Sequence, residues 1–355
     1  MSRKWFFLIS ALLFFSAFGS RSTVASLDRA MIHAVGIDPA EDGFNVTLQI
    51  FRPDSAGTET QLDPAKANIF TVSASGKTVS AAMTGCENKL GEFLFIGHVQ
   101  LIVLGSGIDL ASPYELLAPF IRSKESYLGA KLAFTDDSAS KLLSAELSEG
   151  AVSAQSLVSI IERSAENSVT ADCDLLAALS DDTGSLAVPV LKVTDASGDE
   201  KEKTVTTDGA WALRDGRREF RLSAEDCSGL ALLLCDGAVP EITRQGITVR
   251  AKEKTGSLSV SEKERRCRFS ISVCIPEDLV TGLLDEGELC RACEQELRPR
   301  CERIIALCTK HRTDLLGISK AVRARCPQLW LDCGESFEGL MNVLDVSCGV
   351  SCEVR

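Results

Sequence analysis

GIDPAEDGFNVTLQI, residues 36–50, is the stretch that decides the fold at the start of this 355-residue chain. From Phe44 to Ile50, apolar and polar side chains alternate, which is the two-residue period of a half-buried strand. Residues 38–43 contain Pro39 and an Asp-Gly pair, and both are typical of turns. A short apolar run, residues 34–37, precedes this turn. The stretch therefore predicts a β-hairpin.

The chain downstream of the hairpin alternates between helical and extended patterns up to residue 193. We expect helices near residues 78–90, 114–121 and 153–163, and strands near 93–104, 128–134 and 188–193. We also expect a short helix that ends at Leu143 and is capped by Asp136 or Asp137, because a carboxylate accepts the free amides of a first helical turn. The alternation predicts mixed sheets covered by helices.

The second half shows both patterns again. Strands are expected at 209–213 and 219–222 around an Asp-Gly turn, then as a pair at 247–251 and 267–273, and finally at 344–354. Helices are expected at 289–298 and 301–308, where Pro299 lacks an amide donor and should kink or restart the helix, and from Asp314 to Cys326. The fold class expected is α+β, with several mixed sheets and packed helices in more than one domain.

Four segments organise the chain. Residues 1–26 have the pattern of an export signal: a basic start, then the apolar run Trp5–Phe18, which is shorter than the ~20 residues that span a bilayer. A retained N-terminal anchor is the alternative interpretation. Residues 194–206 are polar and charged and form the expected linker between an N-terminal α/β part, 27–193, and a C-terminal part, 207–355.

The charge balance excludes one class of partner. The chain has 50 acidic and 38 basic residues and a net charge of −12. Nucleic-acid binding needs clustered Lys and Arg against the phosphates, and no basic stripe is present in the sequence. We therefore expect no nucleic-acid partner.

Cysteine is the unusual component, with 14 residues of this type. Cys290-x-x-Cys293, followed by Cys301, Cys308 and His311, suggests a zinc site, which needs four converging Cys or His ligands. However, these cysteines fall at the apolar positions of the expected helices, and Cys is among the most buried residue types. We interpret them as core residues and expect no metal and no cofactor. Disulfides stay open as an alternative in an exported protein.

Catalytic patterns are weak throughout the sequence. The Gly-x-Ser-x-Gly elbow of hydrolases is missing from it, and His98 lies within an apolar run. The pairs Asp136-Asp137 and Asp181-Asp182 fit caps and turns better than a glycosidase pair. We assign no catalytic residue from the sequence.

Several segments, in order, carry a resemblance. They are GID at 36–38 followed by VTLQI at 46–50, FIGHVQLIVLG at 95–105, GAWAL at 209–213, and DLLGI at 314–318 leading to Pro327 and Trp330. Together they resemble the Ger(x)C family, the C subunit of spore germinant receptors.

The resemblance implies a non-enzymatic, lipoprotein-like receptor subunit at the outer face of the cytoplasmic (spore inner) membrane. It implies two integral membrane partners, the A and B subunits, and a role in nutrient-triggered germination. It also implies three compact mixed α/β domains, the middle one assembled between the two halves of the chain. It brings no catalytic residues.

One position departs from the family pattern. Family members carry a lipobox cysteine followed by Trp-Asp-Arg, whereas this chain has Ser26-Leu-Asp-Arg29. A hydroxyl is not the thiol that acyl transfer needs, so we expect no lipid at Ser26. The chain would then be held by an uncleaved N-terminal helix or by its partners, or be released. A secreted binding protein or hydrolase unrelated to spores is the alternative function.

Overall fold

The structure is a computed structural model. It describes residues 29–51, 69–147, 150–181, 183–195, 203–239, 242–244, 247–249, 251, 253–276 and 285–354. The expected signal, residues 1–26, lies outside the described residues, and so does Ser26.

The N-terminal part is built on one mixed sheet. Its strand order is β11-β10-β9-β6-β5-β1-β2-β3, and β4 pairs with β1. These strands are β1 (Arg29–Ala40), β2 (Gly43–Phe51), β3 (Ile69–Gly76), β4 (Phe93–Phe95), β5 (Leu101–Leu104), β6 (Lys131–Phe134), β9 (Ser185–Asp195), β10 (Lys203–Arg214) and β11 (Arg217–Leu222). The predicted hairpin is confirmed, because β1 and β2 pair antiparallel with Ala40 opposite Gly43.

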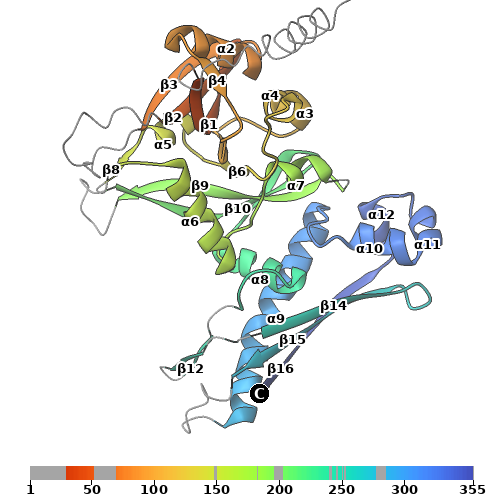
Figure 1. The fold of residues 1–355 in the computed structure, drawn as a ribbon. Coiled ribbons are helices and arrows are strands. Elements are labelled where there is room, and N and C mark those ends of the chain that lie inside the picture. The colour runs from red at the N-terminus through yellow and green to blue at the C-terminus, as the bar shows by residue number, and fades with distance from the viewer. Residues whose placement is uncertain are drawn as a thin grey trace, which may run out of the picture.

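Helices cover both faces of this sheet (Figure 1). They are α2 (Val79–Leu90), α3 (Pro113–Leu116), α4 (Ala118–Arg122), α5 (Ala139–Leu143), α6 (Ala154–Glu166) and α7 (Leu175–Ser180). Apolar residues of α2, α3, α4 and α7 pack into the core on one face, and those of α5 and α6 pack on the other. A small hairpin, β7 (Glu146–Leu147) with β8 (Gly150–Ala151), precedes α6.

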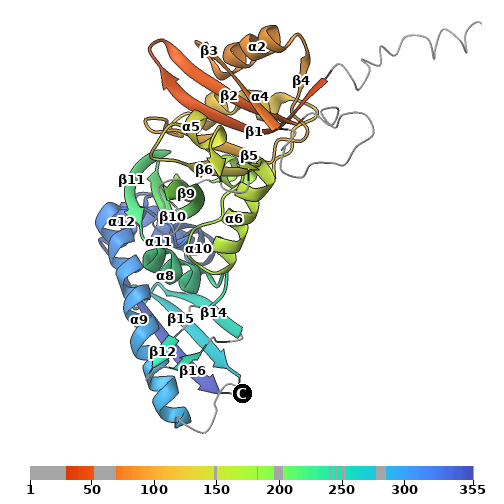
Figure 2. The same cartoon turned by 90° about the vertical axis from the view of Figure 1, so that its left-hand side faces the viewer.

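The C-terminal part contains a second sheet and a long helix. Its elements are α8 (Ala224–Leu234), β12 (Ile242–Arg244), β13 (Ile247–Val249), β14 (Glu253–Ser261), β15 (Arg266–Ile275), α9 (Glu286–His311), α10 (Ile318–Arg325), α11 (Pro327–Asp332), α12 (Phe337–Met341) and β16 (Asp345–Val354). The sheet order is β14-β15-β16, and α9 runs along it (Figure 2). The start of β1 and the C-terminus lie at opposite ends of the molecule in both views.

The expected linker differs from the structure at both of its ends. Residues 194–195 belong to β9 and residues 203–206 belong to β10, and the two strands pair antiparallel with Lys203 opposite Asp195. The alternating Thr and Val residues of 203–207 suit a strand, and the polar composition of the segment concealed this. As a result, the two halves of the chain share one sheet.

The expected strand over residues 93–104 is wrong in one respect, because two strands replace it. A turn at 96–100 separates β4 from β5, and both pair parallel with β1. Gly97 makes this turn possible, since a Cβ there would lie 2.7 Å from the Phe95 ring. His98 is consequently exposed on the turn and does not lie inside a strand.

The long helix α9 corrects a second expectation. Pro299 neither ends nor restarts it, and the helix continues from Glu286 to His311. Residues on both sides of the proline share one buried face, including Cys293, Leu297 and Cys301, each fully buried. Packing on both sides therefore outweighs the loss of one backbone hydrogen bond.

Three smaller expectations also differ from the structure. The expected helix at 114–121 is the two short helices α3 and α4, and the helix expected from Asp314 begins at Ile318. The expected pair of strands at 247–251 and 267–273 does not form. Instead, β13 pairs with β12, while β15 pairs with β14 and β16.

Candidate functional site

The carboxyl ends of three neighbouring parallel strands meet at one edge of the large sheet. Strand β5 lies between β1 and β6 and runs parallel to both. Asp38 stands near the end of β1, Gly105 directly follows β5, and residues 135–138 follow β6. In open α/β sheets, ligands bind outside the carboxyl ends of the strands, so this edge is where a site is expected.

Asp38 binds the start of α5 at this edge. Its carboxylate is almost fully buried and accepts hydrogen bonds from the backbone amides of Ala139 (2.7 Å) and Ser140 (2.9 Å) and from the Ser138 hydroxyl (3.1 Å). The negative charge thus sits at the amino end of α5, where the free amides and the helix dipole favour it. Neither Asp136 nor Asp137 caps this helix; its N-cap residue is Ser138.

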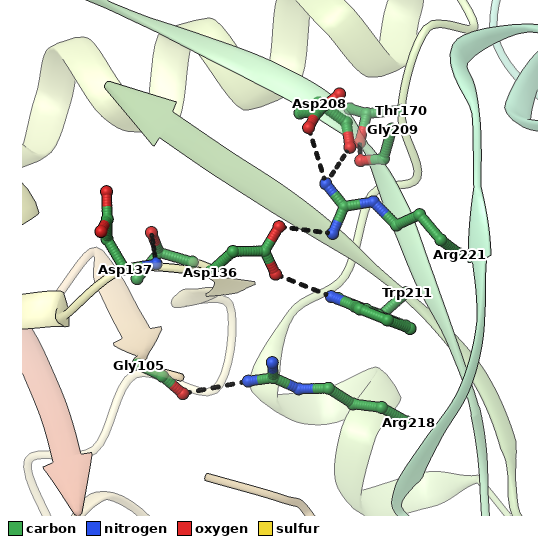
Figure 3. A network of polar contacts seen from close by, with 10 residues as sticks. Gly105, Asp136, Asp137, Thr170, Asp208, Gly209, Trp211, Arg218 and Arg221 are labelled. Carbon is green, nitrogen blue, oxygen red and sulfur yellow. Dashed lines mark hydrogen bonds and ion pairs between the residues drawn. The ribbon is translucent and has the colours of Figure 1, made fainter. Parts of the chain in front are cut away.

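Gly105 lies against this carboxylate. A Cβ at Gly105 would overlap Asp38 Oδ1, so only glycine fits while Asp38 keeps its position. The Gly105 carbonyl accepts a hydrogen bond from Arg218 in the second half of the chain (Figure 3).

Arg218, on β11, lies against the carboxyl ends of β5 and β6. Its Nη2 donates to the carbonyl oxygens of Gly105 (3.0 Å) and Ile108 (3.2 Å), and its guanidinium lies 4.1 Å from the centroid of the Phe134 ring at the end of β6. Burial lowers the pKa of Arg218, although Asp109 and Asp136 act in the opposite direction. An arginine still carries its charge at neutral pH, so a cation is fixed at this edge.

Asp136 connects the loop after β6 with the β10–β11 hairpin. Its Oδ1 accepts a hydrogen bond from Trp211 Nε1 (3.2 Å), and its Oδ2 pairs with Arg221 Nη1 (3.2 Å) (Figure 3). Arg221 also pairs with the carboxylate of Asp208 (3.1 Å) and hydrogen-bonds the Asp208 carbonyl. The Trp211 ring lies within cation–π distance of Arg221, 5.3 Å from ring centroid to guanidinium.

A third contact ties β10 to the segment after α6. Thr170 Oγ1 donates to the Gly209 carbonyl at 2.6 Å. Gly209 has a φ of +61°, and a Cβ there would overlap the Leu222 carbonyl. Glycine therefore allows β10 to bend at the point where it meets the first half of the chain.

This set of residues joins two parts of the chain. We define the joint network as Gly105, Asp136, Thr170, Asp208, Gly209, Trp211, Arg218 and Arg221. Its cations and acids bind one another or backbone carbonyls, and Arg218 lies over the segment after β5 and the end of β6. The arrangement ties the β10–β11 hairpin to the segments that follow β5 and β6.

Sequence reasoning singled out some of these residues, but in other roles. Asp136 was expected as a cap and is a member of the joint network, while Asp137 pairs with Lys141 (3.2 Å) on the surface. Arg218 and Arg221 were missed. The available signal was a pair of arginines on the same strand as the buried Phe220, directly after the strand that carries Trp211.

Three of the four cysteines of α9 lie on the buried face that their spacing predicted, whereas Cys290 is only partly buried. Cys293, Cys301 and Cys308 are buried, and the Cys301 thiol hydrogen-bonds Cys348 on β16. All 14 cysteines are free thiols, and burial raises the pKa of Cys308 to about 12. His311 lies apart from them, stacked on Phe220 at 4.5 Å and 3.5 Å from Glu219. Across the described ranges, no three Cys, His, Asp or Glu residues are arranged to hold a metal ion.

Comparisons with known proteins give the class. A family model described as the spore germination protein N-terminal domain matches residues 27–193. The fold is similar to a solved structure described as the crystal structure of the GerBC protein, with a TM-score of 0.53 and 17% sequence identity over 90% of this chain and 96% of that one. No curated protein matches the chain. Residues 27–193 therefore form the N-terminal domain that defines a class of spore germination proteins.

Within this class, the matched domain gives the family of residues 27–193, and the likeness to GerBC shows a shared fold over 90% of the chain. The chain carries the N-terminal domain of the Ger(x)C family over residues 27–193. None of the helices that the structure describes between residues 29 and 354 combines the length and the hydropathy needed to cross a bilayer.

Proposed function

We propose that this chain is the C subunit of a spore germinant receptor and acts with two integral membrane subunits, A and B, in the response of a dormant spore to nutrients. The observation that carries the proposal is the match of residues 27–193 to the spore germination protein N-terminal domain. The likeness in fold to GerBC over 90% of the chain supports a subunit of the same architecture.

The proposed role is binding and transmission, without catalysis. The joint network supports it, because Arg218 binds the Gly105 and Ile108 carbonyls at the sheet edge at which an α/β enzyme would hold its substrate. A subunit that passes a signal between membrane partners needs its parts held in a fixed relation, and the joint network holds β11 against the ends of β5 and β6.

The proposed location is the outer face of the cytoplasmic membrane, which is the inner membrane of the spore. Residues 1–26 supply the export signal, and Ser26 is proposed to carry no lipid. Mass spectrometry of the mature N-terminus tests this point. A diacylglyceryl group on residue 26 would show that the serine does not prevent lipidation.

We also propose a division into three domains, with residues 27–193 and 207–355 as the two contributing parts. The pairing of β9 with β10 supports a middle domain that both parts build, because one strand comes from each side of the division.

A gene deletion tests the receptor role. We expect spores that lack this chain to lose nutrient-triggered germination, and re-expression of the chain to restore it. Re-expression of Arg217→Ala, which changes an exposed arginine next to the joint network, should also restore germination. Unchanged germination in a deletion strain with no duplicate receptor would refute the proposal.

The partner assignment has its own test. After detergent solubilisation of membranes, the tagged chain should co-purify with the A and B subunits encoded in the same genome. Recovery of the chain without either subunit, from membranes that contain both, would contradict the assignment.

A further inference from the structure

Four thiols lie in two pairs between helix α9 and strand β16. The Cys301 thiol donates a hydrogen bond to Cys348, and the Cys352 thiol donates one to Cys293. We name these four residues the thiol ladder. Three of them are buried and Cys352 is partly buried, and all four pack in the core of the C-terminal part. The ladder therefore connects the long helix with the last described strand.

The spacing of the cysteines brings the two pairs into register. Cys293 and Cys301 are eight residues apart on the helix, which is about 12 Å at 1.5 Å per residue. Cys348 and Cys352 are four residues apart on the strand, which is about 13 Å at 3.3 Å per residue. The earlier cysteine of α9 meets the later cysteine of β16, so the two elements run in opposite directions. Because the two lengths agree to about 1 Å, both pairs form along straight elements.

A backbone contact fixes the position of the outer pair independently of the thiols. The amide of Cys352 donates to Glu294 Oε1 at 3.0 Å, and Glu294 directly follows Cys293 on α9. Strand β16 pairs in parallel with β15 from Asp345 to Val354. Among the described residues, β16 has a strand neighbour on this side only. Contact with α9 is therefore its second attachment to the fold.

Thiols in contact are the ones that oxidation can join. A disulfide has an S–S bond of about 2.0 Å and Cβ atoms about 3.5–4.5 Å apart, so sulfurs that already touch need only a small side-chain movement. The hydrogen bond from Cys301 lowers the pKa of Cys348, which favours the thiolate that attacks a disulfide. In the other pair, Cys352 is partly exposed and so accessible to a disulfide reagent. Each pair thus has one feature that the first step needs: a thiolate in one and access in the other.

We propose that the thiol ladder is an oxidation site at which two disulfides, Cys301–Cys348 and Cys293–Cys352, fasten β16 to α9. In each pair, the two thiols lose two protons and two electrons, and one S–S bond forms. The oxidant is a disulfide, carried by a thiol oxidoreductase or by a small thiol such as glutathione, and it is reduced to two thiols. One thiolate of the pair attacks this disulfide to form a mixed disulfide, and its partner then displaces the remaining thiol. The proposal concerns the chemistry of this chain alone and does not depend on the receptor assignment.

Peptide mapping of the oxidised full chain tests the proposal. The purified chain is brought to equilibrium with mixtures of reduced and oxidised glutathione, the remaining thiols are alkylated, and the chain is digested with trypsin without reduction. The Arg and Lys positions place the four cysteines of α9 in four different peptides, while Cys348 and Cys352 stay in one C-terminal peptide. Cys348→Ser and Cys352→Ser each remove one of these two, so that the partner of the other can be identified.

We expect the peptides of Cys301 and Cys293 to be joined to the C-terminal peptide, and four of the 14 thiols to escape alkylation. Cys348→Ser should keep only the link to Cys293, and Cys352→Ser only the link to Cys301. Cys308→Ser is the matched control, because Cys308 is buried on the same helix outside the ladder, and it should keep both links.

Hydrogen exchange measures whether the links fasten the strand. Oxidation should slow the amide exchange of residues 345–354 about tenfold or more, because it ties β16 to α9. The double variant Cys293→Ser and Cys301→Ser has no ladder link and should exchange at the same rate under both conditions. Equal exchange in the reduced and oxidised wild type, with both links present, would show that they do not fasten β16.

Three results of the mapping would overturn the proposal, and the wild type alone gives all three, so the conclusion does not depend on the folding of any variant. The first is full alkylation of Cys301 and Cys293 at every glutathione ratio. The second is that Cys308 is linked as often as the ladder cysteines, which would mean random oxidation of an opened chain. The third is a link from Cys352 to Cys290 in place of Cys293, which would show that the outer pair is wrongly assigned.

Discussion

The guanidinium of Arg218 lies 4.1 Å from the centroid of the Phe134 ring, although 84 positions of sequence separate strand β11 from the end of strand β6. The same side chain donates to two carbonyl oxygens in the segment after β5. One residue thereby links β11 to two parallel strands of the first half.

Loss of Arg218 should weaken this link. In Arg218→Ala, the carbonyls of Gly105 and Ile108 lose a charged donor, and the Phe134 ring loses its cation. We expect the free energy of unfolding to fall by about 2–3 kcal/mol. Urea denaturation followed by circular dichroism measures it. Arg217→Ala, at the exposed neighbouring position, should change the value by less than about 0.5 kcal/mol. Equal losses in the two variants would show that Arg218 has no special role.

Asp136 offers a spectroscopic test of the joint network. Asp136→Asn keeps the side-chain volume but removes the charge that pairs with Arg221, and its amide can no longer accept from both Arg221 and Trp211. We expect a changed Trp211 emission spectrum and a loss of ~1 kcal/mol of stability. Asp137→Asn removes only a surface pair with Lys141 and should leave the emission unchanged. Identical spectra for the wild type and Asp136→Asn would contradict the contact.

The contact between Gly105 and Asp38 predicts a non-additive pair of substitutions. Gly105→Ala places a methyl group against the Asp38 carboxylate, and we expect it to cost about 1–3 kcal/mol. Asp38→Ala removes the obstructing carboxylate, along with its bonds to α5. Gly105→Ala should therefore cost less in an Asp38→Ala background than in the wild type, as a double-mutant cycle measures. Strict additivity would mean that the two residues do not interact.

Asp226 predicts how stability depends on pH in the C-terminal part. Burial acts to raise the pKa of Asp226, but hydrogen bonds from Arg303 (2.5 Å) and Ser223 outweigh it and hold the pKa below its usual value. A lowered pKa of a carboxyl group in the folded state gives stability that is present above its unfolded pKa of ~3.9 and is lost as pH falls through the folded pKa.

The measurement compares the wild type with Asp226→Asn across pH. The stability difference between them should be largest near pH 6 and should shrink as pH falls below about 4. Glu225→Gln is the control, because Glu225 is mostly exposed and lies 3.8 Å from its partner Arg300. A wild-type advantage over Asp226→Asn that stays constant from pH 6 down to pH 2 would contradict the assignment.

Local patterns explain which elements were predictable. The hairpin of residues 36–50 and helix α2 follow from the spacing of neighbouring side chains, and both have the predicted position. The turn that separates β4 from β5 was missed, because an apolar run does not reveal where its backbone bends. The effect of Pro299 on the helix was overestimated. The helix stays continuous across Pro299 because its buried face packs against other parts of the fold, and a local pattern does not show such packing.

The joint network was beyond such reasoning because its contacts are distant in sequence. Arg218 meets Gly105 across 113 residues, and Asp136 meets Trp211 and Arg221 across 75 and 85 residues. Each residue alone has an ordinary local role in the sequence. Only the pairing of β9 with β10 shows that these positions belong together.

The shared sheet also sets an order of events during biogenesis. Strand β9 pairs with β10, and β10 pairs with β11, so the sheet begun by β1 is complete only when residue 222 has been delivered. Until then, first β9 and then β10 presents an unpaired edge to any neighbouring chain, which favours aggregation. For an exported chain, the exposed edge exists between the arrival of residue 195 and the arrival of residue 222. A chaperone at the exit of the translocation channel would matter most in this interval.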